Sequence, residues 1–90
     1  MESLKPKIAI IGAGYVGSTF AFTLMISGLA REIVLIDKNE LLAKGECMDL
    51  NHGLSLTHPT KIYAAGYESC EDADIVVITA GAKQNWFNSG

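Results

Sequence analysis

Cysteine is scarce in this sequence of 90 residues, and basic residues never cluster. The two cysteines, Cys47 and Cys70, form no C-x-x-C pair, so neither a disulfide scaffold nor a zinc site is indicated; we expect a reduced, cytoplasmic chain without a metal. Seven Lys and Arg against ten Asp and Glu leave a net charge of −3, which argues against a nucleic-acid partner. Apolar residues make up 49% and charged residues only 19%, which excludes a disordered chain.

Charged residues are missing altogether from Ile8 to Ala30, a length that could cross a membrane. Four glycines and four hydroxyl residues interrupt this segment, and a β-branched run gives way to a helical part. We therefore interpret the segment as a buried strand followed by a buried helix, and we expect no membrane partner.

Apolar, β-rich runs alternate with helical segments along the chain. The pattern predicts strands at 7–11, 33–36, 61–65 and 75–79, helices at about 16–29 and 40–50 with Gly53 as a stop beyond the second, and a short polar helix or turn at 68–73. The predicted fold class is α/β: a partial Rossmann fold whose parallel sheet of about four strands, in the order 3-2-1-4, is covered by helices. Ninety residues allow one domain at most.

The first predicted helix is apolar on two opposite sides. Phe22, Met25, Ile26 and Leu29 share one of these faces, which nothing else in the predicted fold covers. An exposed apolar patch commonly marks an interface, so we expect a homo-oligomer formed through this helix face.

A glycine-rich motif, Gly12-Ala13-Gly14-Tyr15-Val16-Gly17, lies directly between the first strand and the first helix. Asp37 ends the next strand, twenty residues after Gly17, and this arrangement is the dinucleotide-binding fingerprint. The glycines allow a tight turn, close approach of a pyrophosphate and close helix packing, while the helix N-terminus attracts phosphate. Asp37 could accept hydrogen bonds from ribose hydroxyls and would repel a 2′-phosphate, so NAD is predicted over NADP. The alternative is a glycine-rich turn without a ligand.

The fourth predicted strand ends at Thr79 and is followed by the small residues Ala80-Gly81-Ala82. Open α/β sheets bind ligands at the carboxyl ends of their strands, so we predict cofactor contacts here as well. The carboxylates of residues 68, 71, 72 and 74 are interpreted as a solvated face, and no nucleophile–histidine–acid arrangement can be proposed.

Four segments together resemble the L-lactate dehydrogenase family and its malate dehydrogenase relatives: KIAIIGAG (7–14), EIVLID (32–37), MDLNHG (48–53) and DADIVVITAGA (72–82). The resemblance covers about residues 7–84, the first quarter or so of such an enzyme. It implies a glycolytic enzyme with NAD contacts from Val16, Asp37, Tyr67 near the adenine, and Gly81 with Ala82. Gln84 falls where lactate dehydrogenases carry a glutamine facing the substrate methyl group, whereas malate dehydrogenases carry an arginine; a neutral side chain favours pyruvate and lactate.

The sequence departs from the family after Gln84. The tail 85–90 does not match, and Gly90 stands where the family's mobile loop carries its catalytic arginine. Two lesser departures are Leu42, where the family has a basic residue, and Gly66, where an acidic one is common. We therefore expect residues 1–84 to be an NAD-binding half-domain, with the catalytic histidine, its aspartate and the substrate domain absent.

The resulting hypothesis is an NAD-binding fragment of an L-lactate dehydrogenase. The complete enzyme would transfer hydride between NADH and pyruvate, whereas the 90 residues alone would contain no catalytic residue and show no turnover. The alternatives are a fragment of malate dehydrogenase type and a non-catalytic module that binds NAD or self-associates.

Overall fold

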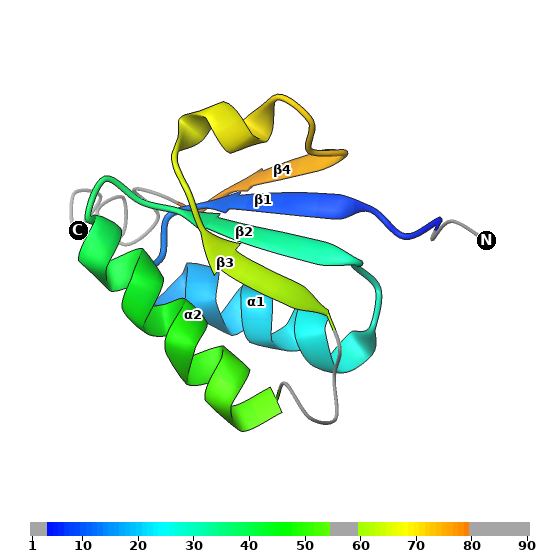
Figure 1. The fold of residues 1–90 in the computed structure, drawn as a ribbon, viewed down its shortest axis with the longest axis horizontal. Coiled ribbons are helices and arrows are strands. Elements are labelled where there is room, and N and C mark those ends of the chain that lie inside the picture. Colours follow the sequence, from blue (N-terminus) through cyan, green and yellow to red (C-terminus); the bar gives the residue numbers. More distant parts are fainter. Residues whose placement is uncertain (1–3, 55–59, 80–90) are drawn as a thin grey trace, which may run out of the picture.

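The computed structural model describes residues 4–54 and 60–79. Strands and helices alternate in it as the sequence predicts (Figure 1): β1 (Lys7–Ile11), α1 (Tyr15–Ser27), β2 (Glu32–Ile36), α2 (Glu40–Leu54), β3 (Lys61–Ala64), the 3₁₀ helix η1 (Tyr67–Cys70) and β4 (Ile75–Ile78). The four strands form one parallel sheet in the order β3-β2-β1-β4, which confirms the predicted topology.

The central strand β1 pairs with β2 on one side and with β4 on the other. Ile11 is level with Ile36 of β2 and with Ile78 of β4, so the three strands end together at one edge of the sheet. Because the chain turns back across β1 between β3 and β4, this carboxyl edge contains the switch point where open α/β sheets bind ligands.

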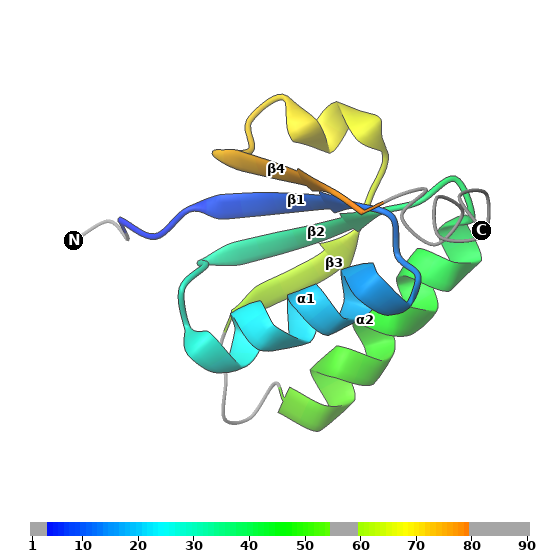
Figure 2. The same ribbon diagram turned by 180° about the vertical axis from the view of Figure 1, so that it is seen from behind.

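Helices α1 and α2 cover one face of the sheet, and the η1 segment lies over the other (Figures 1 and 2). The larger core cluster lies under the two helices and includes Ile8, Ile10, Ile33 and Leu35, while Ala9, Val34 and Ile36 form a smaller cluster on the opposite face. Burial on both faces explains why β1 and β2 are apolar without alternation. Within 4–54 and 60–79, no helix is long and apolar enough to span a membrane.

Helix α1 buries a narrow stripe composed of Gly17, Ala21, Leu24 and Met25. The prediction that Met25 belongs to the exposed face is wrong: its side chain is 1% exposed. Residues four and eight positions apart lie above one another on a helix, so Met25 falls in line with Ala21 and Gly17 against the sheet. Phe22 and Ile26 are 43% and 46% exposed, as expected, and Leu29, which is 64% exposed, lies beyond the end of α1 at Ser27 rather than on the helix as predicted.

Helix α2 begins where Asn39 accepts a hydrogen bond from the backbone amide of Leu42, at 3.1 Å. It continues to Leu54, so the predicted end near Leu50 and the predicted stop at Gly53 are both wrong. The side-chain amide of Asn51 donates to the carbonyl of Ile62 in β3, at 3.3 Å. This tertiary hydrogen bond attaches the last turn of the helix to the sheet.

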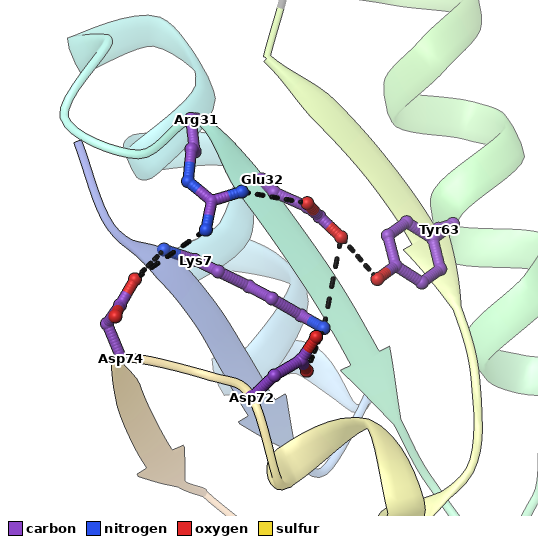
Figure 3. Close-up of polar contacts among 6 residues, drawn as sticks. All are labelled: Lys7, Arg31, Glu32, Tyr63, Asp72 and Asp74. Atoms are coloured by element: carbon purple, nitrogen blue, oxygen red, sulfur yellow. Dashed lines mark hydrogen bonds and ion pairs between the residues drawn. The ribbon is translucent and has the colours of Figure 1, made fainter. Parts of the chain in front are cut away.

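At the opposite, amino edge of the sheet, six polar side chains form a network (Figure 3): Lys7, Arg31, Glu32, Tyr63, Asp72 and Asp74. Lys7 is buried, and its ammonium group lies 2.5 Å from Asp72 and 3.9 Å from Glu32. The hydrogen bond to Asp72 raises the pKa of Lys7 and lowers that of Asp72. The network joins β1, β2, β3 and the segment before β4, so it stabilises the sheet without reaching the carboxyl edge.

Candidate nucleotide-binding site

The glycine-rich turn lies at the carboxyl edge of the sheet, between β1 and α1. Gly12 has a φ of 110°, a conformation that side-chain-bearing residues rarely adopt, and its amide donates to the carbonyl of Ile36 at 2.7 Å. The turn therefore leaves β1 sharply while remaining attached to the end of β2, as expected for the first glycine of the motif.

Gly17 is buried against this turn. A Cβ atom on Gly17 would lie 1.8 Å from the carbonyl oxygen of Gly12 and 2.9 Å from its carbonyl carbon. The absence of a side chain is what allows the first turn of α1 to approach the end of β1, which confirms the close packing that the motif predicts.

The N-terminus of α1 is open to solvent. Its N-cap residue, Gly14, provides no side-chain cap, and the first turn contains no acidic residue. A Cβ at Gly14 would meet no atom within 4 Å. Tyr15 is 84% exposed and Val16 is 50% exposed. The first amides of a helix have no intrahelical acceptor, and with the positive end of the helix dipole they form a site suited to an anion such as phosphate.

Asp37 lies beside the turn, at the end of β2. One carboxylate oxygen accepts the amide of Ala13 at 2.7 Å and the other accepts the amide of Asn39 at 2.8 Å. A carboxylate oxygen has two lone pairs, so both oxygens keep acceptor capacity for a hydroxyl ligand. The link between Asp37 and Ala13 is not signalled by the sequence, because the two residues are 24 positions apart.

A hollow of about 60 Å³ opens next to Asp37, lined by Ile11, Gly12, Asp37, Lys38 and Tyr67. Tyr67 begins η1 and is 56% exposed, so the structure brings it to the predicted side of the turn. Lys38 and Ile11 were not predicted as lining residues; their only signal in the sequence is adjacency to the motif residues Asp37 and Gly12. An aromatic ring, a carboxylate and an ammonium group around one hollow offer stacking and hydrogen bonding to a nucleoside.

Thr79 directly follows β4, and its amide donates to the carbonyl of Ile11 at 2.8 Å, so it lies next to the turn. The other predicted residues of this strand end, Ala80, Gly81 and Ala82, lie outside the described residues, as does Gln84.

Other chemistry-bearing side chains lie away from this edge. Cys47 is packed in the core on α2, where burial raises its pKa to about 11. His52 is exposed on the last turn of α2. Within the described ranges, no group of three or more His, Cys, Asp or Glu residues could hold a metal ion.

Comparison with known proteins places this geometry in a family. Residues 6–86 match the family described as lactate/malate dehydrogenase, NAD binding domain. The chain belongs to this family. The match confirms the family resemblance drawn from the sequence, and it confirms NAD as the cofactor of the family's domain.

The curated relatives include a probable L-lactate dehydrogenase of Schizosaccharomyces pombe and an L-lactate dehydrogenase of Acetivibrio thermocellus, 60% and 58% identical over 78 residues. The matches cover 87% of this chain but 24% and 25% of those proteins, so this chain spans about a quarter of their length. A Cryptosporidium parvum malate dehydrogenase superposes with a TM-score of 0.80 (40% identity, 87% of this chain and 25% of that one). A lactate dehydrogenase of Eimeria maxima, solved with NADH and oxamate, has a TM-score of 0.79 (36% identity, 90% and 25%).

Proposed function

We propose that this domain binds NAD across the carboxyl edge of its sheet. The observation that carries the proposal is the uncapped N-terminus of α1 next to Asp37 and the hollow lined by Tyr67. In this arrangement the pyrophosphate binds the amides that follow Gly14, and Asp37 accepts hydrogen bonds from the adenosine ribose. The adenine lies toward Tyr67, and the predicted contacts of residues 80–82 serve the nicotinamide half.

The test is a calorimetric titration of the 90-residue chain with NADH and with NADPH. We expect saturable binding of NADH and much weaker binding of NADPH, because Asp37 repels a 2′-phosphate. The matched variant is Asp37→Asn, which keeps an oxygen for the amide of Ala13 but removes the charge. It should reduce the preference for NADH by about tenfold or more, the equivalent of one charge-assisted hydrogen bond. Equal affinity of the unaltered, folded chain for both nucleotides would contradict the role of Asp37.

We further propose that the protein containing this domain transfers hydride between NADH and pyruvate. The names of the curated relatives support lactate dehydrogenase, and the neutral Gln84 supports pyruvate over a dicarboxylate such as oxaloacetate. The alternative, malate dehydrogenase, is favoured by the similarity to the Cryptosporidium parvum structure. The 90 residues alone are expected to bind the cofactor without turnover, since His52 is the one histidine in the described part and lies at the far end of α2.

Grafting residues 1–84 onto the remainder of the Schizosaccharomyces pombe relative gives an enzyme whose reduction of pyruvate and of oxaloacetate can be compared. Lactate dehydrogenase function predicts a higher kcat/KM for pyruvate, and Gln84→Arg should shift the preference toward oxaloacetate. A graft that prefers oxaloacetate without this change would favour the malate alternative. Pyruvate reduction by the 90-residue chain alone would contradict the expected absence of turnover.

A second candidate function is self-association through α1. Phe22 and Ile26 on this helix, and Leu29 just beyond its end, have exposed apolar side chains. We expect concentration-dependent association by light scattering, reduced by Phe22→Lys. A chain that stays monomeric at millimolar concentration would rule this function out.

A further inference from the structure

The peptide unit that joins Gly12 and Ala13 is held from both sides by residues far away in the sequence. Its carbonyl accepts a hydrogen bond from the hydroxyl of Thr79 at 3.0 Å, across a separation of 67 residues. Its amide donates to the carboxylate of Asp37 at 2.7 Å, across 24 residues. One partner comes from the end of β4 and the other from the end of β2, on opposite sides of β1.

The hydroxyl of Thr79 has two carbonyl acceptors in reach. Its distance to the carbonyl of Ile11 is 3.2 Å, longer than the 3.0 Å to that of Gly12. The carbonyl of Ile11 already accepts the backbone amide of Thr79 at 2.8 Å. We therefore assign the hydroxyl of Thr79 as a donor to the carbonyl of Gly12, because Gly12 is buried and its carbonyl needs a donor.

Helix α1 touches the same pair of groups. The position of a Cβ on Gly17 lies 1.8 Å from the oxygen of Gly12 and 3.2 Å from the hydroxyl oxygen of Thr79. The carbonyl–hydroxyl pair thus forms the surface on which the first turn of α1 rests. A rotation of the Gly12–Ala13 peptide would move that surface and the amides that follow it.

We propose that Thr79 is a positioning residue, which together with Asp37 fixes the Gly12–Ala13 peptide before a ligand binds. This rests on the proposed binding of NAD, and it replaces the expected direct contact between Thr79 and the cofactor. Glycine at φ 110° has little intrinsic preference for one orientation of the next peptide, so the turn needs external partners to hold it. A turn already in place loses less entropy when the pyrophosphate binds, and affinity rises accordingly.

The test compares Thr79→Val, which removes the hydroxyl at nearly constant shape, with Thr79→Ser, which keeps it. Thr60→Val is the matched control, because the hydroxyl of Thr60 also donates to a carbonyl, that of Ala30 at 3.2 Å, but away from the carboxyl edge. The first measurement needs no ligand: amide hydrogen exchange of Ala13 relative to core amides of β1 and β2. We expect Thr79→Val to speed exchange at Ala13 about tenfold, the equivalent of one lost hydrogen bond, and the other two variants to leave it unchanged.

The second measurement is the affinity for NADH and for ADP, which has the pyrophosphate but no nicotinamide. Positioning of the turn predicts that Thr79→Val weakens both ligands by the same factor, about tenfold, with recovery in Thr79→Ser. A loss of affinity for NADH but not for ADP would mean that Thr79 contacts the nicotinamide half directly, and it would overturn the proposal. Unchanged exchange at Ala13 would overturn it as well. If the unaltered chain bound neither ligand, the NAD proposal would fail, while the exchange measurement would still decide whether Thr79 holds the turn.

Discussion

The contact between Gly17 and Gly12 allows a quantitative prediction. Gly14 and Gly17, the two glycines at the start of α1, differ sharply in the space around them, so one can serve as the control for the other. A Cβ at Gly17 would lie 1.8 Å from a backbone oxygen, whereas real Cβ contacts essentially never fall below 3.0 Å. Gly17→Ala therefore requires a displacement of more than about 1 Å between α1 and the end of β1. The two nearest atoms, the carbonyl oxygen and carbonyl carbon of Gly12, belong to the backbone, so neither is the end of a flexible side chain that could move aside at little cost.

We expect Gly17→Ala to lower the free energy of unfolding by about 3 kcal/mol, the upper end of the range for overpacked sites. A domain of this size has a total stability of only about 5 kcal/mol, so a large part of it would be lost. With a urea dependence of about 1 kcal/mol per molar, the unfolding midpoint should fall by about 3 M. Urea titration followed by circular dichroism at 222 nm measures this shift.

Gly14→Ala is the matched control. The site has a φ of −75°, which any residue adopts, and a Cβ there meets no atom within 4 Å. The urea unfolding midpoint of Gly14→Ala should stay within about 0.5 M of that of the unaltered chain. Its affinity for NADH should fall, because the added methyl group lies where the pyrophosphate approaches. A Gly17→Ala chain as stable as the original, or a Gly14→Ala chain that falls equally far, would refute this explanation of the motif.

Three further predictions concern other parts of the fold. Replacing Asn39 by Ala should destabilise the chain by about 1 kcal/mol in urea titration and replacing it by Asp should not, since only alanine removes the N-cap of α2. In the folded chain, Cys47 should resist iodoacetamide at pH 8 while the half-buried Cys70 reacts sooner, because burial keeps the Cys47 thiol protonated; equal rates by mass spectrometry would contradict this. The stabilisation from the Lys7–Asp72 pair should be lost as pH falls through the lowered pKa of Asp72 and as it rises through the raised pKa of Lys7. Lys7→Met should flatten both limbs of the plot of urea midpoint against pH.

Regular elements and their order follow from local patterns in this sequence. Continuous apolar runs at 8–11 and 33–36, rich in β-branched residues, predicted strands buried on both faces, and their alternation with helices predicted a parallel sheet in the order 3-2-1-4. The glycine-rich motif followed by Asp37 predicted a turn at the carboxyl edge with Asp37 near it, and the structure has both. These features are encoded within a few neighbouring residues, so they can be read without knowing what packs where.

Only the tertiary structure decided which apolar side of each helix is buried. Both sides of α1 are apolar, and Met25 belongs to the core because it lines up with the small residues Ala21 and Gly17, which allow close approach to the sheet. Helix α2 likewise continues past Gly53 to Leu54, and Asn51 in its last turn hydrogen-bonds to β3.

The partners of the turn were also decided by the fold. Asp37 and Thr79 were predicted from the sequence as ligand contacts, and in the structure both hydrogen-bond to the peptide between Gly12 and Ala13, from opposite sides. Hydrogen bonds between residues 24 and 67 positions apart cannot be predicted from neighbouring residues in the sequence, because they form only when β2 and β4 pair with β1 in register. The sequence by itself determined the elements and the motif, and pairing of the strands determined what holds the motif in place.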